Sequence, residues 1–308
     1  MTLQSILSHK SGSVRYHESH FEPYRKRTYH VSTRAFILIF LIAIAKGSSS
    51  EAVPTEREPA PSPDTQVATS NYLSAFSFDD FEIVEVPNIG KFYIDPDVKG
   101  LVRSALRDGR PHSAGLIEIF EKYVRPGSTA IDAGAHIGSL TVPLARLVGP
   151  EGHVYAFEPQ REVHRELYHN LQLNNLTQAT ALKLAVSSEP GFVEMMDLPE
   201  PFSADGWGRI GKGGEKVEAR TLDSFQLSDV SLIKIDVEGH EIPVIQGAEK
   251  TIRSNHPVLV IETGEKNLTV LRPLLANWGY EIEKIENSWA DYLAIHQDKE
   301  ADPPSHAD

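Results

Sequence analysis

The sequence reads Thr129-Ala130-Ile131-Asp132-Ala133-Gly134-Ala135-His136-Ile137-Gly138 at the point that decides the fold. Its first four residues predict a short buried strand, and Gly134 and Gly138 predict a tight turn into a helix over residues 139–148. A second predicted strand, residues 153–157, is followed by Glu158. Ligands of open parallel sheets bind beyond the carboxyl ends of the strands. This order therefore predicts a nucleoside-like ligand against the glycine turn, with Glu158 accepting its ribose hydroxyls.

Strand and helix patterns alternate along the rest of this region, which predicts an α/β fold with a mainly parallel sheet. We predict further strands at 179–185, 193–196, 216–220, 231–236, 258–262, 281–285 and 292–296, and helices at 161–173, 242–253 and 268–278. The last two strands are joined by a short connection, which predicts a C-terminal antiparallel hairpin. Upstream, a hairpin around Asn88-Ile89-Gly90 and helices at 98–107 and 114–124 form an N-terminal cap.

The bulk composition bounds the classes of partner and site. The chain has 308 residues, a formal net charge of −13 and a pI of about 5.5. Such an acidic surface repels a phosphate backbone, so we expect no nucleic-acid partner. The sequence contains no cysteine, which excludes disulfides and thiolate metal sites.

The ends of the chain have the composition of segments without a packed core. We expect a disordered extension over 1–34, a flexible linker over 46–78 and a disordered tail over 297–308, flanking a cap at 79–125 and a main domain at 126–296. Residues 35–45 are an uninterrupted apolar run preceded by basic residues. This run favours a signal peptide or a short membrane anchor, and so a possible membrane association, with a cytoplasmic protein as the alternative.

A second motif reads Leu232-Ile233-Lys234-Ile235-Asp236-Val237-Glu238-Gly239-His240-Glu241. Together with the stretches at 132–138, 157–159, 221–223 and 258–262, it closely resembles the FkbM family of S-adenosylmethionine-dependent methyltransferases. The resemblance covers about residues 80–295. It implies a Rossmann-like, seven-stranded, mainly parallel sheet with helices on both faces. It also implies O-methylation of a small hydroxylated substrate such as a sugar, lipid or secondary metabolite. One departure is His136, which stands where the family commonly has asparagine.

The glycine spacing favours S-adenosylmethionine as the cofactor. The motif is Gly-x-x-x-Gly and lacks the Gly-x-Gly-x-x-Gly spacing with which a dinucleotide fold holds a pyrophosphate. We expect the amino-acid end of the cofactor beside Gly134, with Asp132 or its neighbours facing the ammonium group. The predicted cofactor-binding residues are Asp132, Gly134, Ala135, His136, Gly138, Glu158, Ala185 and Val186.

The predicted catalytic residues are Asp236, His240 and Glu262, which lie at or just after the carboxyl ends of two strands. An alcohol is a weak nucleophile, so a base beside the acceptor helps the transfer. Glu238 and Glu241 stand near the start of a predicted helix, where they either join this site or stabilise the helix dipole. The acidic cluster with His240 also leaves a divalent ion open as an alternative, although we predict no metal.

Two other functions remain open at this stage. One is an NAD-dependent oxidoreductase, against which the glycine spacing argues. The other is a catalytically inactive methyltransferase-like module that only binds its ligand. Acceptor specificity is expected in the cap and in a glycine-rich insertion at 199–215, which has the composition of a mobile lid.

Overall fold

The computed structural model describes residues 77–196, 208, 210, 211 and 213–299. The predicted extension, the apolar run 35–45, nearly all of the predicted linker, most of the glycine-rich insertion and residues 300–308 lie outside the described residues. Within the described part of the chain, no helix combines the length and apolarity needed to cross a bilayer.

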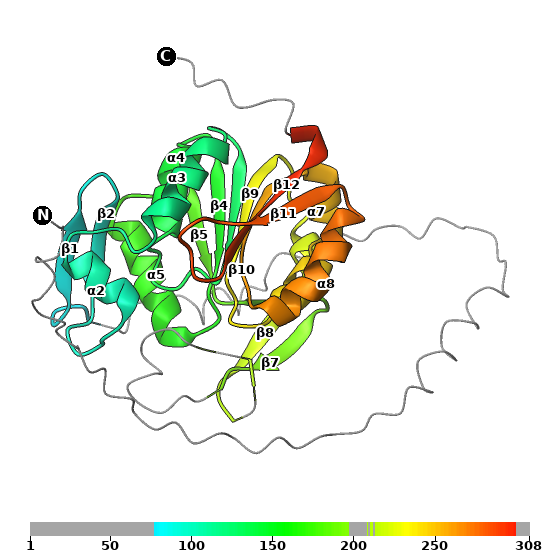
Figure 1. The fold of residues 1–308 in the computed structure, drawn as a ribbon. Helices are drawn as coiled ribbons and strands as arrows, with labels where there is room; N and C mark the ends of the chain where they lie inside the picture. The colour runs from blue at the N-terminus through cyan, green and yellow to red at the C-terminus, as the bar shows by residue number, and fades with distance from the viewer. Residues whose placement is uncertain (1–76, 197–207, 209, 212, 300–308) are drawn as a thin grey trace, which may run out of the picture. The chain divides into compact units, whose positions relative to one another are not determined.

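A seven-stranded sheet forms the centre of the fold (Figure 1). Its order is β11-β12-β10-β9-β3-β4-β5. The strands are β3 (Thr129–Ala133), β4 (His153–Phe157), β5 (Ala179–Leu182), β9 (Val230–Ile235), β10 (Val258–Glu262), β11 (Tyr280–Lys284) and β12 (Asp291–His296). All pairs are parallel except those of β12, which runs antiparallel to both neighbours. The predicted antiparallel hairpin is therefore present, with β12 inserted between β10 and the edge strand β11. The strand order reverses between β3 and β9, which is where an open sheet binds its ligand.

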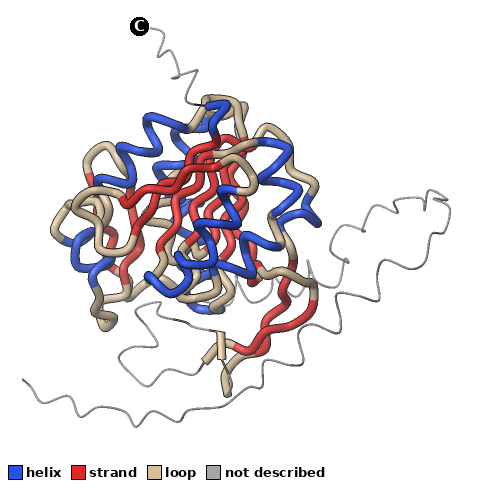
Figure 2. Tube along the Cα trace, turned by 45° about the vertical axis from the view of Figure 1, so that its right-hand side comes forward, coloured by secondary structure: helices blue, strands red, loops and turns tan. Residues whose placement is uncertain are grey.

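Helices cover both faces of this sheet, as Figure 2 shows. One face packs against α3 (Ala114–Tyr123), α4 (Thr141–Val148) and α5 (Arg161–Leu173), and the other against α6 (Glu241–Gln246), α7 (Glu249–Asn255) and α8 (Glu265–Ala276). Successive side chains of a strand point to opposite faces. Leu232 accordingly joins the first core and Ile233 the second, and both are fully buried.

The N-terminal cap shares a core with the main sheet domain. It comprises the hairpin β1 (Glu82–Val86) and β2 (Gly90–Ile94), the helix α2 (Leu101–Arg107), and α3. The fully buried Phe92 of β2 belongs to the same cluster as Leu167 of α5. Arg103 of α2 forms a buried ion pair with Glu166 of α5, with Nη2 and Oε1 2.7 Å apart. The cap is therefore fixed against α5 by apolar contact and by charge.

The strand predicted at 179–185 is in fact two strands in two sheets. β5 ends at Leu182, and the chain then turns so that the amide of Leu184 donates to the carbonyl of Leu182 at 2.9 Å. Ala185 and Val186 form β6, which pairs with β8 (Lys216–Arg220) beside β7 (Gly191–Glu194). The stretch 179–185 contains no glycine or proline that would signal this change of sheet, so the prediction of a single strand was wrong.

The helix predicted at 242–253 is also divided, into α6 and α7. Asp223, in the 3₁₀ turn η1 (Leu222–Phe225), caps the second helix, because its carboxylate accepts the amides of Lys250 and Thr251 at 3.0 and 2.8 Å. Gly247 lies at the break, and a Cβ there would stand 2.0 Å from the carbonyl oxygen of Ser187. A distant acidic cap thus starts the second helix, and a close backbone contact lies where the first helix ends; neither feature belongs to the local helical period.

Candidate functional site

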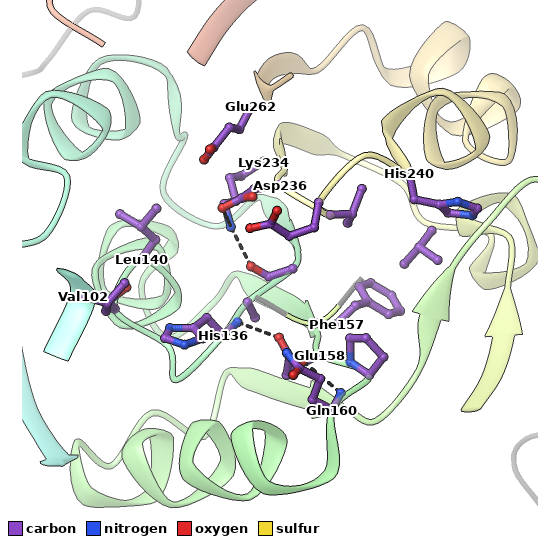
Figure 3. A pocket seen from close by; sticks show the side chains of 18 of the residues that line it. Val102, His136, Leu140, Phe157, Glu158, Gln160, Lys234, Asp236, His240 and Glu262 are labelled. Carbon is purple, nitrogen blue, oxygen red and sulfur yellow. Dashed lines mark hydrogen bonds and ion pairs between the residues drawn. The ribbon is translucent and has the colours of Figure 1, made fainter. Parts of the chain in front are cut away.

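A pocket opens at the carboxyl ends of β3, β4 and β9, where the strand order reverses (Figure 3). Most of the predicted site residues line it, namely Gly134, Ala135, His136, Glu158, Ala185, Val186, Asp236, His240 and Glu262. Asp132 and Gly138 are not among the lining residues. They belong to the same loop region but act from behind the pocket wall.

Gly134 brings the loop after β3 against the end of β9. Its φ is +84°, and a Cβ at this position would lie 1.7 Å from the carbonyl oxygen of Asp236. Its amide and that of Ala135 both donate to the carbonyl of Phe157, at 3.0 and 2.9 Å. The turn is therefore held between β9 and β4, and only glycine fits there.

His136 occupies a left-handed backbone conformation, with φ of +51°. Its amide donates to Glu158 Oε2 at 3.0 Å. Asparagine and histidine tolerate this region better than most residues. The backbone requirement thus accounts for histidine at a position where the resembled family commonly has asparagine.

Glu158 follows β4 and is buried, although it lines the pocket. Its carboxylate is oriented by the protein, because Oε2 accepts the amide of His136 and Oε1 accepts the amide of Gln160 at 2.9 Å. Burial raises the pKa of Glu158 to about 7, against the opposing effect of these two amides. Hydroxyl donors from a ligand would favour its charged form.

Lys234 also lines the pocket, and its place in the sequence was compatible either with pairing to an acid or with exposure to solvent. It is buried on β9, and its Nζ donates to the carbonyl of Gly134 at 2.6 Å. The same Nζ lies 3.2 Å from Asp132 Oδ1 and 3.3 Å from Asp236 Oδ2. Burial alone would lower the pKa of Lys234, but the two carboxylates raise it above its ordinary value.

Asp132 is fully buried and faces Lys234 and α4, where its Oδ2 accepts the hydroxyl of Thr141 at 2.7 Å. Asp132 of β3 and Lys234 of β9 are opposite each other on these two paired strands. Asp132 therefore anchors Lys234, which in turn holds the Gly134 turn.

Asp236 follows β9, and Glu262 is the last residue of the adjacent strand β10. Both line one end of the pocket. Asp291 stands opposite Glu262 across β10 and β12 and lines the same region, as does His112 of the cap. Partial desolvation, together with the charges of Asp236 and Asp291, raises the pKa of Glu262 to about 8. Desolvation also lowers the pKa of His112, so burial opposes a positive charge on this imidazole beside the carboxyl groups.

The His240 ring turns away from Asp236, as Figure 3 shows. Its Nε2 lies 2.9 Å from the hydroxyl of Ser187, and burial lowers its pKa. Glu241 is buried and holds the loop, because Oε1 accepts the amide of Gly239 at 2.7 Å and Oε2 accepts the Asn267 side chain at 2.8 Å. The residues 236–241 therefore do not converge on one point.

The motif at 232–241 left a divalent ion open as an alternative. Among the described residues, its acidic side chains and His240 do not come together as a set of metal ligands. The group of three potential ligand atoms that the described residues bring within 4.8 Å of one another comprises His256, His296 and Asp298, outside the pocket.

The pocket suits a ligand with three kinds of group. Its small apolar wall at Ala185 and Val186 can lie against an aromatic base, and the oriented carboxylate of Glu158 can accept ribose hydroxyls. The acidic end beyond Gly134 favours positive charge. S-Adenosylmethionine carries an adenine, a ribose, a sulfonium and an ammonium, so the residues present fit this cofactor.

Residues 132–282 match the family model of the methyltransferase FkbM domain. The chain is similar to hexuronic acid methyltransferase AglP of Haloferax volcanii, 27% identical over 135 residues that are 42% of this chain and 53% of that relative. It is also similar to methyltransferase sdnD of Sordaria araneosa, 26% identical over 200 residues that are 52% of this chain and 76% of the relative. The chain thus spans about half the length of the first relative and three quarters of the second.

Among solved structures, the chain is similar to a methyltransferase FkbM from Methylobacillus flagellatus KT. The identity is 18%, the TM-score is 0.42, and the match covers 65% of this chain and 56% of the other.

Proposed function

We propose that this chain, in which residues 132–282 form a methyltransferase FkbM domain that uses S-adenosylmethionine, transfers a methyl group to a hydroxyl of a small acceptor. The observation that carries the proposal is a single pocket with two different ends. Glu158 is oriented at one end, and Asp236 and Glu262 lie at the other. The first end suits a nucleoside and the second suits a hydroxyl that must lose a proton.

In this proposal the cofactor is held by the residues around the glycine turn. Gly134, Ala135 and His136 provide the backbone wall, Glu158 accepts the ribose hydroxyls, and Ala185 and Val186 contact the adenine. Gly138 and Asp132 support the loop from behind. The cofactor supplies an activated methyl group on a positively charged sulfur, so the protein's task is to align the acceptor and accept its proton.

At the acceptor end of the pocket, either Glu262 or Asp236 accepts the proton of the hydroxyl that is methylated. Glu262 is partly solvated and has a raised pKa, which suits a base that works near neutral pH. Asp236 is already paired with Lys234, so we assign Glu262 as the base and Asp236 as the group that orients the acceptor. His240 contacts Ser187 and acts as a positioning residue for the pocket wall.

A sugar is the acceptor class that the site and the first relative favour together. Trp289 lies in the loop that leads to Asp291, and its side chain is 93% exposed. An exposed aromatic ring two residues before Asp291 offers a stacking face for a sugar ring, and the pocket carboxylates offer acceptors for its hydroxyls. The relative from Haloferax volcanii is named for hexuronic acid, another carbohydrate.

Calorimetric titration with S-adenosylmethionine, and separately with NAD, tests the cofactor assignment. We expect binding of the first and none of the second. Glu158→Gln should weaken the binding of S-adenosylmethionine by roughly 10- to 100-fold, because a hydrogen bond to a charged group contributes about 1.5–3 kcal/mol. The exposed Glu162→Gln is the matched control and should bind as the wild type does. Preferential binding of NAD would reverse the assignment.

A methyl-transfer screen with labelled donor against sugars, lipids and hydroxylated metabolites then tests the reaction. Transfer to a hydroxyl supports the proposal. If the donor binds but no acceptor in these classes is methylated, the inactive binding module becomes the better description. Localisation needs a separate measurement, namely whether a tagged full-length protein is secreted, membrane-bound or cytoplasmic.

The pH dependence of transfer should identify the base. With the donor saturating, the rate at low acceptor concentration should rise with pH, because Glu262 must be deprotonated. The midpoint should lie above the ordinary pKa of a glutamate and at or below about 8. Glu262→Gln should remove this rise of the rate with pH and lower the rate by about 10²- to 10⁴-fold.

Asp236→Asn distinguishes the two carboxylates. The charge of Asp236 helps to raise the pKa of Glu262. Removing this charge should therefore move the midpoint of the rise in rate to lower pH. If the rise of the rate with pH instead disappears in Asp236→Asn and persists in Glu262→Gln, Asp236 is the base and our assignment is wrong.

A further inference from the structure

Carboxyl groups stand on three neighbouring strands at the acceptor end of the pocket. Asp236 follows β9, Glu262 ends β10, and Asp291 begins the antiparallel strand β12. The order β12-β10-β9-β3 places these three residues in a row that leads away from the glycine turn after β3. Asp291 is therefore the member of the row that lies the most strands away from the turn expected to hold the cofactor.

The ammonium group beside this row has no donor left for a ligand. Among the described residues that line the pocket, Lys234 is the only lysine or arginine. An ammonium group has three N–H donors. The Nζ atom lies 2.6 Å from the Gly134 carbonyl oxygen, 3.2 Å from Asp132 Oδ1 and 3.3 Å from Asp236 Oδ2, so all three donors have partners. A negatively charged acceptor would find no free lysine or arginine among these residues.

Glu262 and Asp291 are opposite each other on paired strands, and neither forms an ion pair with a described residue. Like charges directly opposite on neighbouring strands are unfavourable. Asp291 is oriented by Ser288, whose hydroxyl donates to Oδ2 at 2.6 Å. Desolvation and the charge of Asp236 raise the pKa of both carboxyl groups, that of Glu262 to about 8. This end of the pocket thus carries more acidic groups than its surroundings stabilise in charged form.

The cap faces the same end of the pocket with His112, which lies between α2 and α3. Desolvation lowers the pKa of this imidazole, although Asp236 and Asp291 act in the opposite direction. Burial therefore works against a positive charge beside Asp291. An uncharged imidazole can still donate one hydrogen bond and accept another, which suits a hydroxyl group.

We propose that the acceptor end selects its substrate by charge, positive over neutral over negative, with Asp291 as the specificity-determining residue. This inference rests on the proposed O-methylation and narrows its acceptor to hydroxyl compounds that are uncharged or carry a protonated amine. A carboxylate beside Glu262 and Asp291 would add a like charge and keep Glu262 protonated, which disables the proposed base. The acceptor would then differ in charge from hexuronic acid, for which the relative from Haloferax volcanii is named.

Matched methyl glycosides of glucose, galactose and mannose test this selection, each supplied as the neutral hexose, the amino sugar and the uronate. The full chain is given saturating labelled S-adenosylmethionine at neutral pH, and kcat/KM is measured for each sugar. We expect the amino sugar to match or exceed its hexose and the uronate to be slower by roughly tenfold or more, because one unit charge nearby has an effect of this order in a partly solvated pocket. Added salt should reduce the difference, since it screens charges.

Two variants assign the selection to Asp291. Asp291→Asn should bring the uronate to within about threefold of its hexose, and Asp291→Lys should place the uronate ahead of the amino sugar. The Ser288 hydroxyl can still donate to the asparagine oxygen, so the first variant should fold. Ratios between sugars cancel any change in the pKa of Glu262. Asp298→Asn, at the other end of β12 with its side chain 74% exposed, is the matched control and should keep the wild-type order.

The inference alone is overturned if the wild type methylates a uronate as well as its hexose, or if Asp291→Asn leaves their ratio unchanged. If the protein binds S-adenosylmethionine but methylates none of these sugars, the sugar acceptor of the proposed function is wrong and the inference falls with it.

Discussion

Gly134→Ala should abolish measurable binding of S-adenosylmethionine and destabilise the protein by about 3–5 kcal/mol. Alanine adds a Cβ 1.7 Å from the carbonyl oxygen of Asp236 and must also adopt a φ of +84°. The strain of a left-handed residue and the forced movement of packed backbone each cost about 1–3 kcal/mol. The loop has to move away from β9, and the cofactor wall moves with it. Calorimetry and urea unfolding measure the two effects.

Gly109→Ala is the matched control for this change. Its φ is +69°, but a Cβ there meets nothing within 4 Å. It therefore carries the backbone strain without the collision, and should cost about 1–2 kcal/mol with unchanged donor binding. Equal losses in the two variants would mean that the close approach to Asp236 contributes nothing.

The second large effect is expected from Lys234→Met, which removes the cation shared by Asp132 and Asp236. Asp132 would remain fully buried, with the Thr141 hydroxyl still donating to it but without the charge of Lys234. Removing one partner of a buried ion pair costs about 3–5 kcal/mol, because the other charge stays desolvated. We expect a lower urea midpoint with an unchanged slope, and weaker donor binding because the Gly134 carbonyl loses its donor.

The double variant Lys234→Met/Asp132→Asn separates charge from packing. It should regain a large part of the lost stability, because no unpaired buried charge is left. The exposed Lys250→Met is the control and should change stability by less than about 0.5 kcal/mol. If Lys234→Met is as stable as the wild type, the proposed buried network has no energetic importance.

Much of the sheet was accessible from sequence because its signals are local. The apolar runs that became β3, β4 and β10 are bounded by turn residues, and the Gly134 turn separates β3 from its helix. Their parallel arrangement follows from alternation with helices. The change of sheet at Lys183 and Leu184 could not be predicted in this way, because it depends on pairing of Ala185 with the distant β8.

The candidate site shows the same limit. Order and spacing located Glu158, Asp236 and Glu262 at strand ends, and all three line the pocket. The partnership of Lys234 with Asp132 joins residues about a hundred positions apart and is visible only once β3 and β9 pair. The single available clue was a lysine between two isoleucines in a strand buried on both faces. The direction of the His240 ring depends on Ser187 in another segment and had no sequence signal.

The ion pair between Arg103 and Glu166 also sets where a gene fragment of this protein can begin. A fragment starting at Asp132, where the family match starts, would keep Glu166 and discard Arg103 together with Phe92. It would leave Glu166 without its cation and expose the apolar face of α5 to water, which favours aggregation. A shortened version for crystallisation or directed evolution should therefore start before Glu82, so that both hairpin strands and α2 are translated with the sheet they cover.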